Sequence, residues 1–383
     1  MDEWHDILPF LQNRRLVWWA QCTALFSIVS ERYIQHAQWK RKGLAVLAEN
    51  GDLPGVLYLV ERCGADVHAL NEDALRHGSM NGHLEVVKYL VLECGADVHA
   101  DNEDALRHAS MNGHLEVVKY LVLECGADVH SREEDALRLA SLRGHLEVVK
   151  YLVLECGADV HRRIWFGYNA LGEASENGHL NVVRFLVEKG GADVHARGLC
   201  GYNALICASL KGHFEVVRYL VEQGADIHLY NECALRRASY NGHLEMVKHL
   251  VLEGGADVHA ENEGALREAS MHGHLEVVRW LVENGADVHA RDEEALRCAS
   301  NYGHLEVVKY LVLECGADVH AREEEALRNA SGNGHLEVVK YLVEQGANVH
   351  ARNEEALRYA SNNGHVQLVQ FLRRNRSGSS FKE

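Results

Sequence analysis

The sequence predicts an all-α solenoid built from about eleven stacked helix–turn–helix units. A segment of the type Gly-His-Leu-Glu-Val-Val recurs at intervals of 30 or 31 residues, which lengthen twice to 34. A second segment, of the type Gly-Ala-Asp-Val-His, occurs ten times, and the whole chain of 383 residues contains only two prolines. A fixed period of this length is typical of repeat architectures, and the scarcity of proline permits helices nearly everywhere.

Each unit is predicted to begin with a short helix of the pattern Ala-Leu-Arg-x-Ala-Ser. Ala105, Leu106, Ala109 and Ser110 are small or apolar at helical spacing, so this helix can pack closely against its neighbours. Gly113 ends it, because glycine is a poor helix former.

A second helix follows in each unit, and its residues are apolar around most of the circumference. The example from Leu115 to Val122 reads Leu-Glu-Val-Val-Lys-Tyr-Leu-Val, a pattern typical of a helix buried on several sides. Gly126 is expected to end it as a C-cap glycine. Neither helix is long enough to be stable alone, so stacking of neighbouring units must bury the apolar faces.

The unit resembles the ankyrin repeat, whose family pattern is Thr-Pro-Leu-His, then Gly-His-Leu-Glu-Val-Val, then Gly-Ala-Asp-Val-Asn. The resemblance covers roughly residues 43–372. The Thr-Pro start is replaced by pairs such as Asp104-Ala105, in which the aspartate can still cap the helix. Arginine stands where the family's first motif has histidine: Arg76, Arg107, Arg138, Arg236, Arg267, Arg297, Arg328 and Arg358.

Against the family pattern, most units also lack about three residues of the β-hairpin finger. Two units keep a full finger, at residues 164–169 and 198–203, where Gly167 and Gly201 can supply the positive φ of a turn. Short fingers with Ala-Leu-Arg starts resemble the large ankyrin families of giant DNA viruses of amoebae. The resemblance therefore implies short β-hairpin or loop fingers, and a host-cell location if the source is viral.

The two ends of the chain differ from the repeats. We expect residues 1–42, which contain four of the six tryptophans, to form a helical cap on a repeat array at 43–372. The alternative is that this segment recruits a second protein. Residues 16–29 are too short to span a bilayer and are expected to form a packed helix, with a signal or anchor as the alternative. Residues 373–383 are expected to be a disordered polar and basic tail.

Composition narrows the classes of partner and the compartment. The net charge of −17 argues against nucleic acid and against an anionic membrane surface, because both require clustered lysine and arginine. The ten cysteines do not suggest a disulfide framework, because five of them stand at the same point of the repeat, and equivalent residues of stacked units lie roughly 10 Å apart. We therefore expect reduced thiols and an intracellular protein, cytoplasmic or nuclear.

Two groups of residues are candidate contacts for a protein partner. Ankyrin repeats bind partners on the concave face formed by fingers and first helices, so exposed aromatic residues on the full fingers indicate an interface. The alternative is that these aromatic residues shield one another. A second group precedes the Gly-His motif, where the residues vary between units, and its alternative role is to cover adjacent helices. The candidates are Trp165, Phe166, Tyr168, Leu199 and Tyr202 on the fingers, and Met80, Met111, Leu142, Leu210, Tyr240 and Met271 before the motif.

Acidic and histidine residues recur once per unit. A row of glutamates in the short fingers is expected to be a solvated ladder with ion pairs between neighbouring units, or else a surface that attracts a basic segment. The glutamates are Glu72, Glu103, Glu134, Glu232, Glu263, Glu293, Glu324 and Glu354. The two rows of histidines are expected to bond loop backbone between units, and no spacing closes a metal site. If both rows are neutral acceptors, mild acid should destabilise the fold.

No motif for catalysis, phosphate binding or cofactor binding breaks the repetition. The sequence therefore predicts a monomeric, non-enzymatic scaffold without cofactors, which binds a protein partner on the concave face of the solenoid. The alternative is an adaptor, in which residues 1–42 recruit a ubiquitin ligase or another enzyme and the repeats select its substrate.

Overall fold

The computed structural model describes residues 37–162, 169–198 and 201–378, and within them 22 α-helices form eleven pairs. The first helices of the pairs are α3 (Ala37–Glu49), α5 (Ala69–Met80), α7 (Ala100–Met111), α9 (Ser131–Arg143), α11 (Ala170–Glu176), α13 (Ala204–Lys211), α15 (Leu229–Tyr240), α17 (Ala260–Met271), α19 (Ala290–Tyr302), α21 (Ala321–Gly332) and α23 (Ala351–Asn362). The predicted all-α repeat fold is confirmed.

The second helices lie beside them. They are α4 (Leu53–Leu57), α6 (Leu84–Leu92), α8 (Leu115–Lys119), α10 (Leu146–Leu154), α12 (Leu180–Glu188), α14 (Phe214–Glu222), α16 (Leu244–Leu252), α18 (Leu275–Glu283), α20 (Leu305–Leu313), α22 (Leu336–Glu344) and α24 (Val366–Gly378). Short π-helical turns, η3 (Tyr58–Arg62) and η4 (Tyr120–Glu124), continue α4 and α8.

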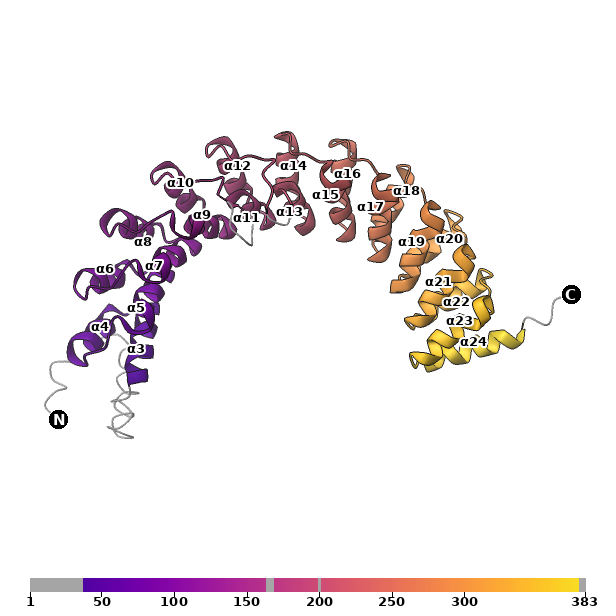
Figure 1. Ribbon diagram of the computed structural model, residues 1–383, viewed down its shortest axis with the longest axis horizontal. Helices are drawn as coiled ribbons and strands as arrows, with labels where there is room; N and C mark the ends of the chain where they lie inside the picture. The colour runs from indigo at the N-terminus through magenta and orange to yellow at the C-terminus, as the bar shows by residue number, and fades with distance from the viewer. Residues whose placement is uncertain (1–36, 163–168, 199–200, 379–383) are drawn as a thin grey trace. The chain divides into compact units, whose positions relative to one another are not determined.

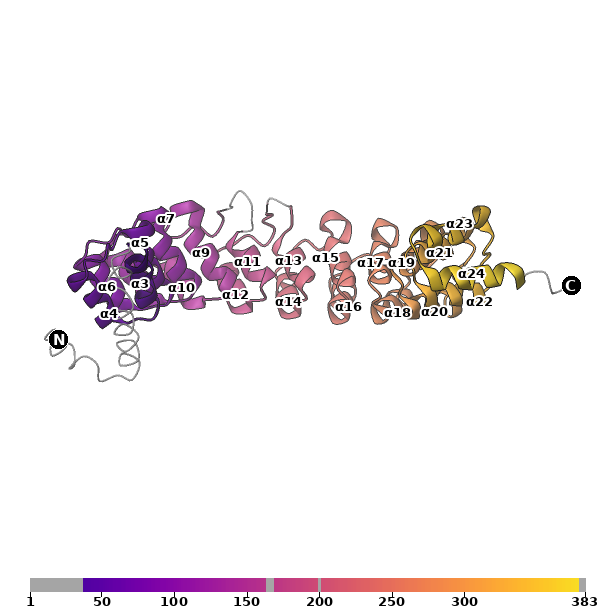
Figure 2. The same cartoon turned by 90° about the horizontal axis from the view of Figure 1, so that it is seen from below.

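The helices are distributed over two compact units. Unit 1 contains the described parts of Met1–Ala174 and Asn181–Asp193, and unit 2 those of Ser175–Leu180 and Val194–Glu383. In unit 1 the first helices α5, α7 and α9 follow one another along one face, and α6, α8 and α10 along the other (Figure 1). Unit 2 repeats this order, with α13 beside α14 and α15 beside α16 (Figure 2). We call the two faces of each unit the first-helix face and the second-helix face.

The core has the composition that the repeat pattern predicts. Ala105, Leu106 and Ala109 of α7 are buried, and so are Val118 and Leu121 of the following second helix. Glycines end both helices, with φ of 79° at Gly113 and 74° at Gly126. Close packing of the small side chains of the first helices against the apolar second helices therefore stabilises each repeat.

Both outer helices of the array cross the domain limits expected from the sequence. Helix α3 begins at Ala37, before the expected limit at residue 42, and α24 continues to Gly378, past the limit at 372. The basic residues after Leu372 are good helix formers, and the amide of Asn375 donates to the carbonyl of Phe371 at 3.0 Å. Positive charge at the end of a helix also suits the negative C-terminal pole of its dipole.

In eight repeats a left-handed turn occupies the place where the sequence predicts a short finger. Three consecutive residues, such as Asp101-Asn102-Glu103, have φ between 49° and 67° in each of these repeats. A side chain in this conformation costs about 1–3 kcal/mol, and least for asparagine or aspartate, which occupy six of the eight middle positions. In unit 2 the arginine of Ala-Leu-Arg binds the turn: Arg297 Nε and Nη2 donate to the carbonyls of Asp292 and Arg291, each at 3.0 Å.

The second full finger is partly described, and it has the hairpin character that the sequence predicts. Arg197 and Asn203 form an antiparallel bridge, and the amide of Gly198 donates to the carbonyl of Tyr202 at 2.8 Å. Gly201 has a φ of 82°, as the turn requires. The first finger at 164–169 lies outside the described residues, except for Asn169.

Candidate protein-binding face

On the first-helix face of unit 1, three candidate contacts follow one another from repeat to repeat. Met80 and Met111 are the last residues of α5 and α7, and Leu142 lies in the last turn of α9. Met80 is exposed, whereas Met111 and Leu142 are half-buried, so each leaves part of its side chain accessible. Covering a neighbour and contacting a partner are therefore both physically possible at the same position.

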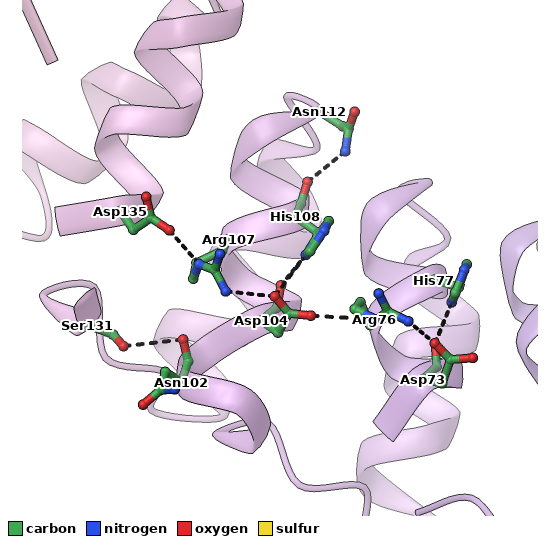
Figure 3. Close-up of polar contacts among 10 residues, drawn as sticks. All are labelled: Asp73, Arg76, His77, Asn102, Asp104, Arg107, His108, Asn112, Ser131 and Asp135. Carbon is green, nitrogen blue, oxygen red and sulfur yellow. Dashed lines mark hydrogen bonds and ion pairs between the residues drawn. The ribbon is translucent and has the colours of Figure 1, made fainter. Parts of the chain in front are cut away.

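Beside these residues a continuous ladder of ion pairs connects the repeats of unit 1 (Figure 3). Arg76 binds Asp73 of its own helix, and its Nε lies 3.5 Å from a carboxylate oxygen of Asp104. Arg107 continues the ladder, with Nη1 at 2.7 Å from Asp104 Oδ1 and Nε at 2.6 Å from Asp135 Oδ2. The predicted ion pairs between neighbouring repeats therefore exist, but they join arginine to the acid one residue before the Ala-Leu-Arg motif.

The ladder ends on Arg138, which joins two repeats. Its Nη2 lies 2.6 Å from Asp135 Oδ1, and its Nη1 lies 2.8 Å from Glu173 Oε1. Burial alone would raise the pKa of Asp135, but hydrogen bonds from Arg107 and Arg138 outweigh burial and hold the pKa below its usual value. Aspartates at the start of the Ala-Leu-Arg motif, which the sequence suggested as helix caps, are thus arginine partners in this ladder.

His77 and His108 lie next to the ladder, one in each of two successive first helices. The Nδ1–H of His108 donates to the carbonyl of Asp104 at 2.9 Å, and His77 makes the same bond to Asp73 at 2.8 Å. The side-chain amide of Asn112 donates to the carbonyl of His108 at 2.9 Å (Figure 3). These bonds fix the polar groups beside Met80 and Met111, so this part of the face is preorganised.

On the first-helix face of unit 2, a row of rings crosses three successive first helices. The ring of Tyr240, the last residue of α15, lies 3.8 Å from the ring of His272, measured between centroids. His272 in turn stacks with Tyr302 of α19, at 6.4 Å and an interplanar angle of 24°. Tyr302 is 51% exposed, whereas Tyr240 and His272 are half-buried, so the row faces solvent mainly through Tyr302. Tyr240 was a candidate from the sequence, whereas His272 and Tyr302 were not. Tyr240 occupies the first of the two variable positions before the Gly-His motif, and His272 and Tyr302 occupy the second.

The other candidates of unit 2 take part in hydrogen bonds that connect neighbouring repeats. Leu210 and Met271 are half-buried, and their main chains accept hydrogen bonds from the next repeat. Tyr202 is also half-buried, and its hydroxyl accepts a hydrogen bond from Arg237 Nη2 at 2.9 Å. The second finger is therefore tied to the next repeat at Tyr202. Four candidates lie outside the described residues: Trp165, Phe166, Tyr168 and Leu199.

The glutamates of the short turns are not solvated, so that expectation is wrong. The side chain of Glu103 is only 6% exposed, and its Oε1 accepts a hydrogen bond from Nδ1 of His99 at 2.6 Å. The same pair occurs in seven other turns, and it is longest in the last one, His350–Glu354, at 3.4 Å. Each histidine of these pairs thus holds a left-handed turn of its own repeat.

The histidines of the Gly-His motif connect neighbouring repeats, as predicted. Nε2–H of His114 donates to the carbonyl of Met80 at 2.9 Å, and His274 makes the equivalent bond to Tyr240. The ring also packs on the glycine of the preceding repeat: a Cβ at Gly82 would collide with it. These imidazoles are donors, because a carbonyl can only accept.

The two rows of histidines differ in the direction of their pKa shifts. Burial lowers the pKa of His114, His243, His274 and His304 in the row that connects repeats. The hydrogen bond to glutamate raises the pKa of the histidines in the turns, from His68 and His99 to His320. The sequence suggested that mild acid would destabilise the fold if both rows were neutral acceptors, and that condition is not met, because the ring nitrogens of both rows face oxygen acceptors.

Neither a metal site nor a membrane-spanning helix is present among the described residues. No group of three or more histidine, cysteine, aspartate or glutamate side chains in these ranges is arranged to hold a metal ion. Within the same part of the chain, no helix has both the length and the apolar composition needed to cross a bilayer.

The comparisons with known proteins agree with the repeat geometry. The model of the family described as "Ankyrin repeats (3 copies)" matches residues 44–133, 137–231, 234–323 and 296–381. No match was found among curated proteins. Ankyrin repeats are generally protein–protein interaction modules, and proteins built from them are typically non-enzymatic scaffolds. Since the family model matches most of its length, the chain belongs to the ankyrin repeat family.

Proposed function

We propose that the chain is a non-enzymatic scaffold that binds a protein partner on its first-helix face, the side expected to be concave. The row formed by Tyr240, His272 and Tyr302 supports this most directly. Large aromatic side chains that remain accessible on adjacent rigid elements are the usual anchors of protein interfaces. Their positions are also those that differ between otherwise similar repeats, so they can carry specificity.

The candidates of unit 1 supply a second part of the proposed binding surface. Met80, Met111 and Leu142 offer apolar edges beside fixed imidazole and amide groups. Methionine adapts its shape to a partner at little cost, whereas the ion ladder beside it keeps the helices in place. We propose that Leu210 and Met271 contribute in the same way, and Tyr202 through the edge that Arg237 leaves accessible. The finger residues Trp165, Phe166, Tyr168 and Leu199 remain proposals from the sequence.

The test compares two variants of the full chain by quantitative affinity purification from a matched extract. In Tyr240→Ala/Tyr302→Ala the aromatic row is removed, and in Leu252→Ala/Leu313→Ala two exposed residues of the second-helix face are removed. A partner bound by the first-helix face should be lost at least about tenfold from the first variant and retained by the second. Equal recovery by both variants, at equal melting temperatures, would contradict the proposal.

The same experiment separates the adaptor role. A protein recruited by residues 1–42 would remain bound to both variants, and of that segment the structure describes only residues 37–42. We further propose that the chain works as a monomer inside cells, cytoplasmic or nuclear. Five of its ten cysteines recur at the same point of the repeat rather than in close pairs, which favours reduced thiols and an intracellular location. The finer resemblance to ankyrin families of giant viruses is supported by the Ala-Leu-Arg starts and the shortened fingers, and it would place the protein in a host cell.

A further inference from the structure

Three leucines are exposed at equivalent positions of three successive repeats in unit 1. Leu92 ends α6, Leu123 lies in η4 and Leu154 ends α10, and their exposed fractions are 68%, 70% and 59%. All three lie on the second-helix face, at the C-terminal ends of neighbouring helices. Large aliphatic side chains this exposed on consecutive repeats are unusual for a surface with no partner.

The other repeats show that the fold does not require leucine at this position. Glutamate occupies it in five repeats, and each of these residues is exposed: Glu61, Glu188, Glu222, Glu283 and Glu344. Leu252 and Leu313 are also exposed there, but in unit 2 Glu283 stands in the repeat between them. Three consecutive leucines therefore occur at this position only around Leu92, Leu123 and Leu154, and the fold alone does not account for them.

The charged groups around the leucines are acidic in balance, because the lysine four residues before each leucine is paired with a glutamate of its own helix, as in Lys88–Glu85, Lys119–Glu116 and Lys150–Glu147. Each leucine is followed by an exposed glutamate, at Glu93, Glu124 or Glu155, and none of the three forms an ion pair with a residue that the structure describes. The carbonyl ends of three helices add partial negative charge at the same edge. A ligand of this strip must therefore combine apolar side chains with positive charge.

The distance between neighbouring leucines of the strip suits an α-helical ligand. Neighbouring helices in such a stack lie about 10 Å apart, and seven residues of an α-helix rise about 10.5 Å. A helix that runs along the repeats can thus present one apolar residue to each leucine, at every seventh position. We propose that Leu92, Leu123 and Leu154 form a docking strip for a basic amphipathic helix of a partner protein. This strip belongs to the second-helix face of unit 1 and shares no residue with the aromatic row, so it does not depend on the function proposed above.

The experiment measures binding of a labelled helical peptide to the full chain by fluorescence anisotropy. The probe has about three heptads with leucine at the repeating apolar positions and lysine and arginine elsewhere, and a second probe carries glutamate in place of the basic residues. The wild type should bind the basic probe, more weakly as salt rises, and should not bind the acidic one.

Two triple variants test the leucines themselves. Leu92→Gln/Leu123→Gln/Leu154→Gln removes the apolar groups without changing charge, and Leu92→Glu/Leu123→Glu/Leu154→Glu introduces the residue that five repeats already carry. Both should raise Kd for the basic probe at least about tenfold. The matched control, Leu252→Glu/Leu313→Glu, should bind as the wild type does.

The glutamate variant distinguishes docking of the peptide on the leucines from general electrostatic attraction of a cationic peptide to an acidic protein. If the acidic chain merely attracted a cationic peptide, three added carboxylates would tighten binding, and that result would overturn the proposal. Failure of the wild type to bind the basic probe would also overturn it. So would sedimentation showing that the wild type dimerises and the glutamine variant does not, because the occupant would then be a second copy of the chain.

Discussion

His114 Nε2 lies 2.9 Å from the carbonyl oxygen of Met80, so a histidine of one repeat closes the end of the first helix in the repeat before it. The same ring lies against Gly82, whose φ is 77°. Helix C-termini leave carbonyls without intrahelical partners, and this imidazole supplies a donor at a repeat boundary. One residue type therefore both ends a helix and aligns the next repeat.

The contact between Gly82 and His114 can be tested with two glycines that differ only in their surroundings. Gly82 and Gly95 have φ of 77° and 70°, but only at Gly82 would a Cβ meet another residue, the imidazole of His114. Gly95→Ala should cost about 1–2 kcal/mol of unfolding free energy, the penalty for a left-handed alanine. Gly82→Ala should cost clearly more, as measured by urea unfolding. Equal losses would mean that the ring moves away freely.

The buried Glu103 should matter more than its counterpart in the last repeat. Its carboxylate is 6% exposed and accepts from His99 at 2.6 Å, whereas Glu354 is 26% exposed and lies 3.4 Å from His350. Glu103→Ala removes the acceptor that holds the left-handed turn and should lower unfolding free energy by about 1–3 kcal/mol. Glu354→Ala should have a smaller effect. Thermal melting of both variants, beside Glu103→Gln, checks this order.

A double-mutant cycle should show that the ion ladder couples repeats. Arg107 and Asp135 are 15% and 9% exposed, and the bond between them is 2.6 Å long. Their coupling free energy should exceed about 1 kcal/mol, because the pair is shielded from solvent. The pair Lys119–Glu116 is 40% and 72% exposed and should couple by only about 0.3–0.5 kcal/mol. A coupling for Arg107–Asp135 no larger than that value would contradict the structural role.

The two histidine rows should respond to pH with opposite sign. The pKa of His99 is raised above 6.5 by Glu103, so its contribution to stability is complete below pH 6.5 and is lost as pH rises through the folded pKa. The pKa of His114 is lowered by burial, so its contribution is present above pH 6.5 and is lost as pH falls. Unfolding free energies of His99→Gln and His114→Gln should therefore differ from the wild type most in acid and at neutral pH, respectively.

The control for this pair of variants is the wild type itself, measured from about pH 5.5 to 8.5, a range that brackets the ordinary histidine pKa. The two rows shift stability in opposite directions as pH changes. The unfolding free energy of the wild type should therefore vary less with pH than the contribution of either row alone. A difference between His114→Gln and the wild type that grows as pH falls would contradict the lowered pKa.

The repeat fold could be predicted from the sequence, because each helix pair and each glycine follows from a local pattern. The link from His114 to the preceding repeat was also predictable, since the histidine recurs once per repeat beside a glycine. The left-handed turn was not, because a segment such as Asp101-Asn102-Glu103 has the polarity of an ordinary loop. The conformation of the turn depends on the buried Glu103, which accepts a hydrogen bond from His99. The sequence alone does not show that this glutamate is buried.

The candidate face was predictable only in part, for a different reason. Tyr240 stands out in the sequence as a large aromatic residue at a variable position. The stacking of His272 between Tyr240 and Tyr302 requires three first helices to end side by side, and no single repeat contains that information. A comparison of the variable positions from repeat to repeat could have identified all three together.

The contact between glycine and imidazole is the same at successive boundaries, because Gly82 meets His114 as Gly113 meets His145. Deletion of residues 83–113 would therefore join Gly82 to His114 and place it opposite His145, the partner that Gly113 has now. Gene duplication or deletion can thus change the number of repeats without creating a mismatched joint. The length of the binding surface can evolve in whole repeats, while the chemistry of each boundary stays the same.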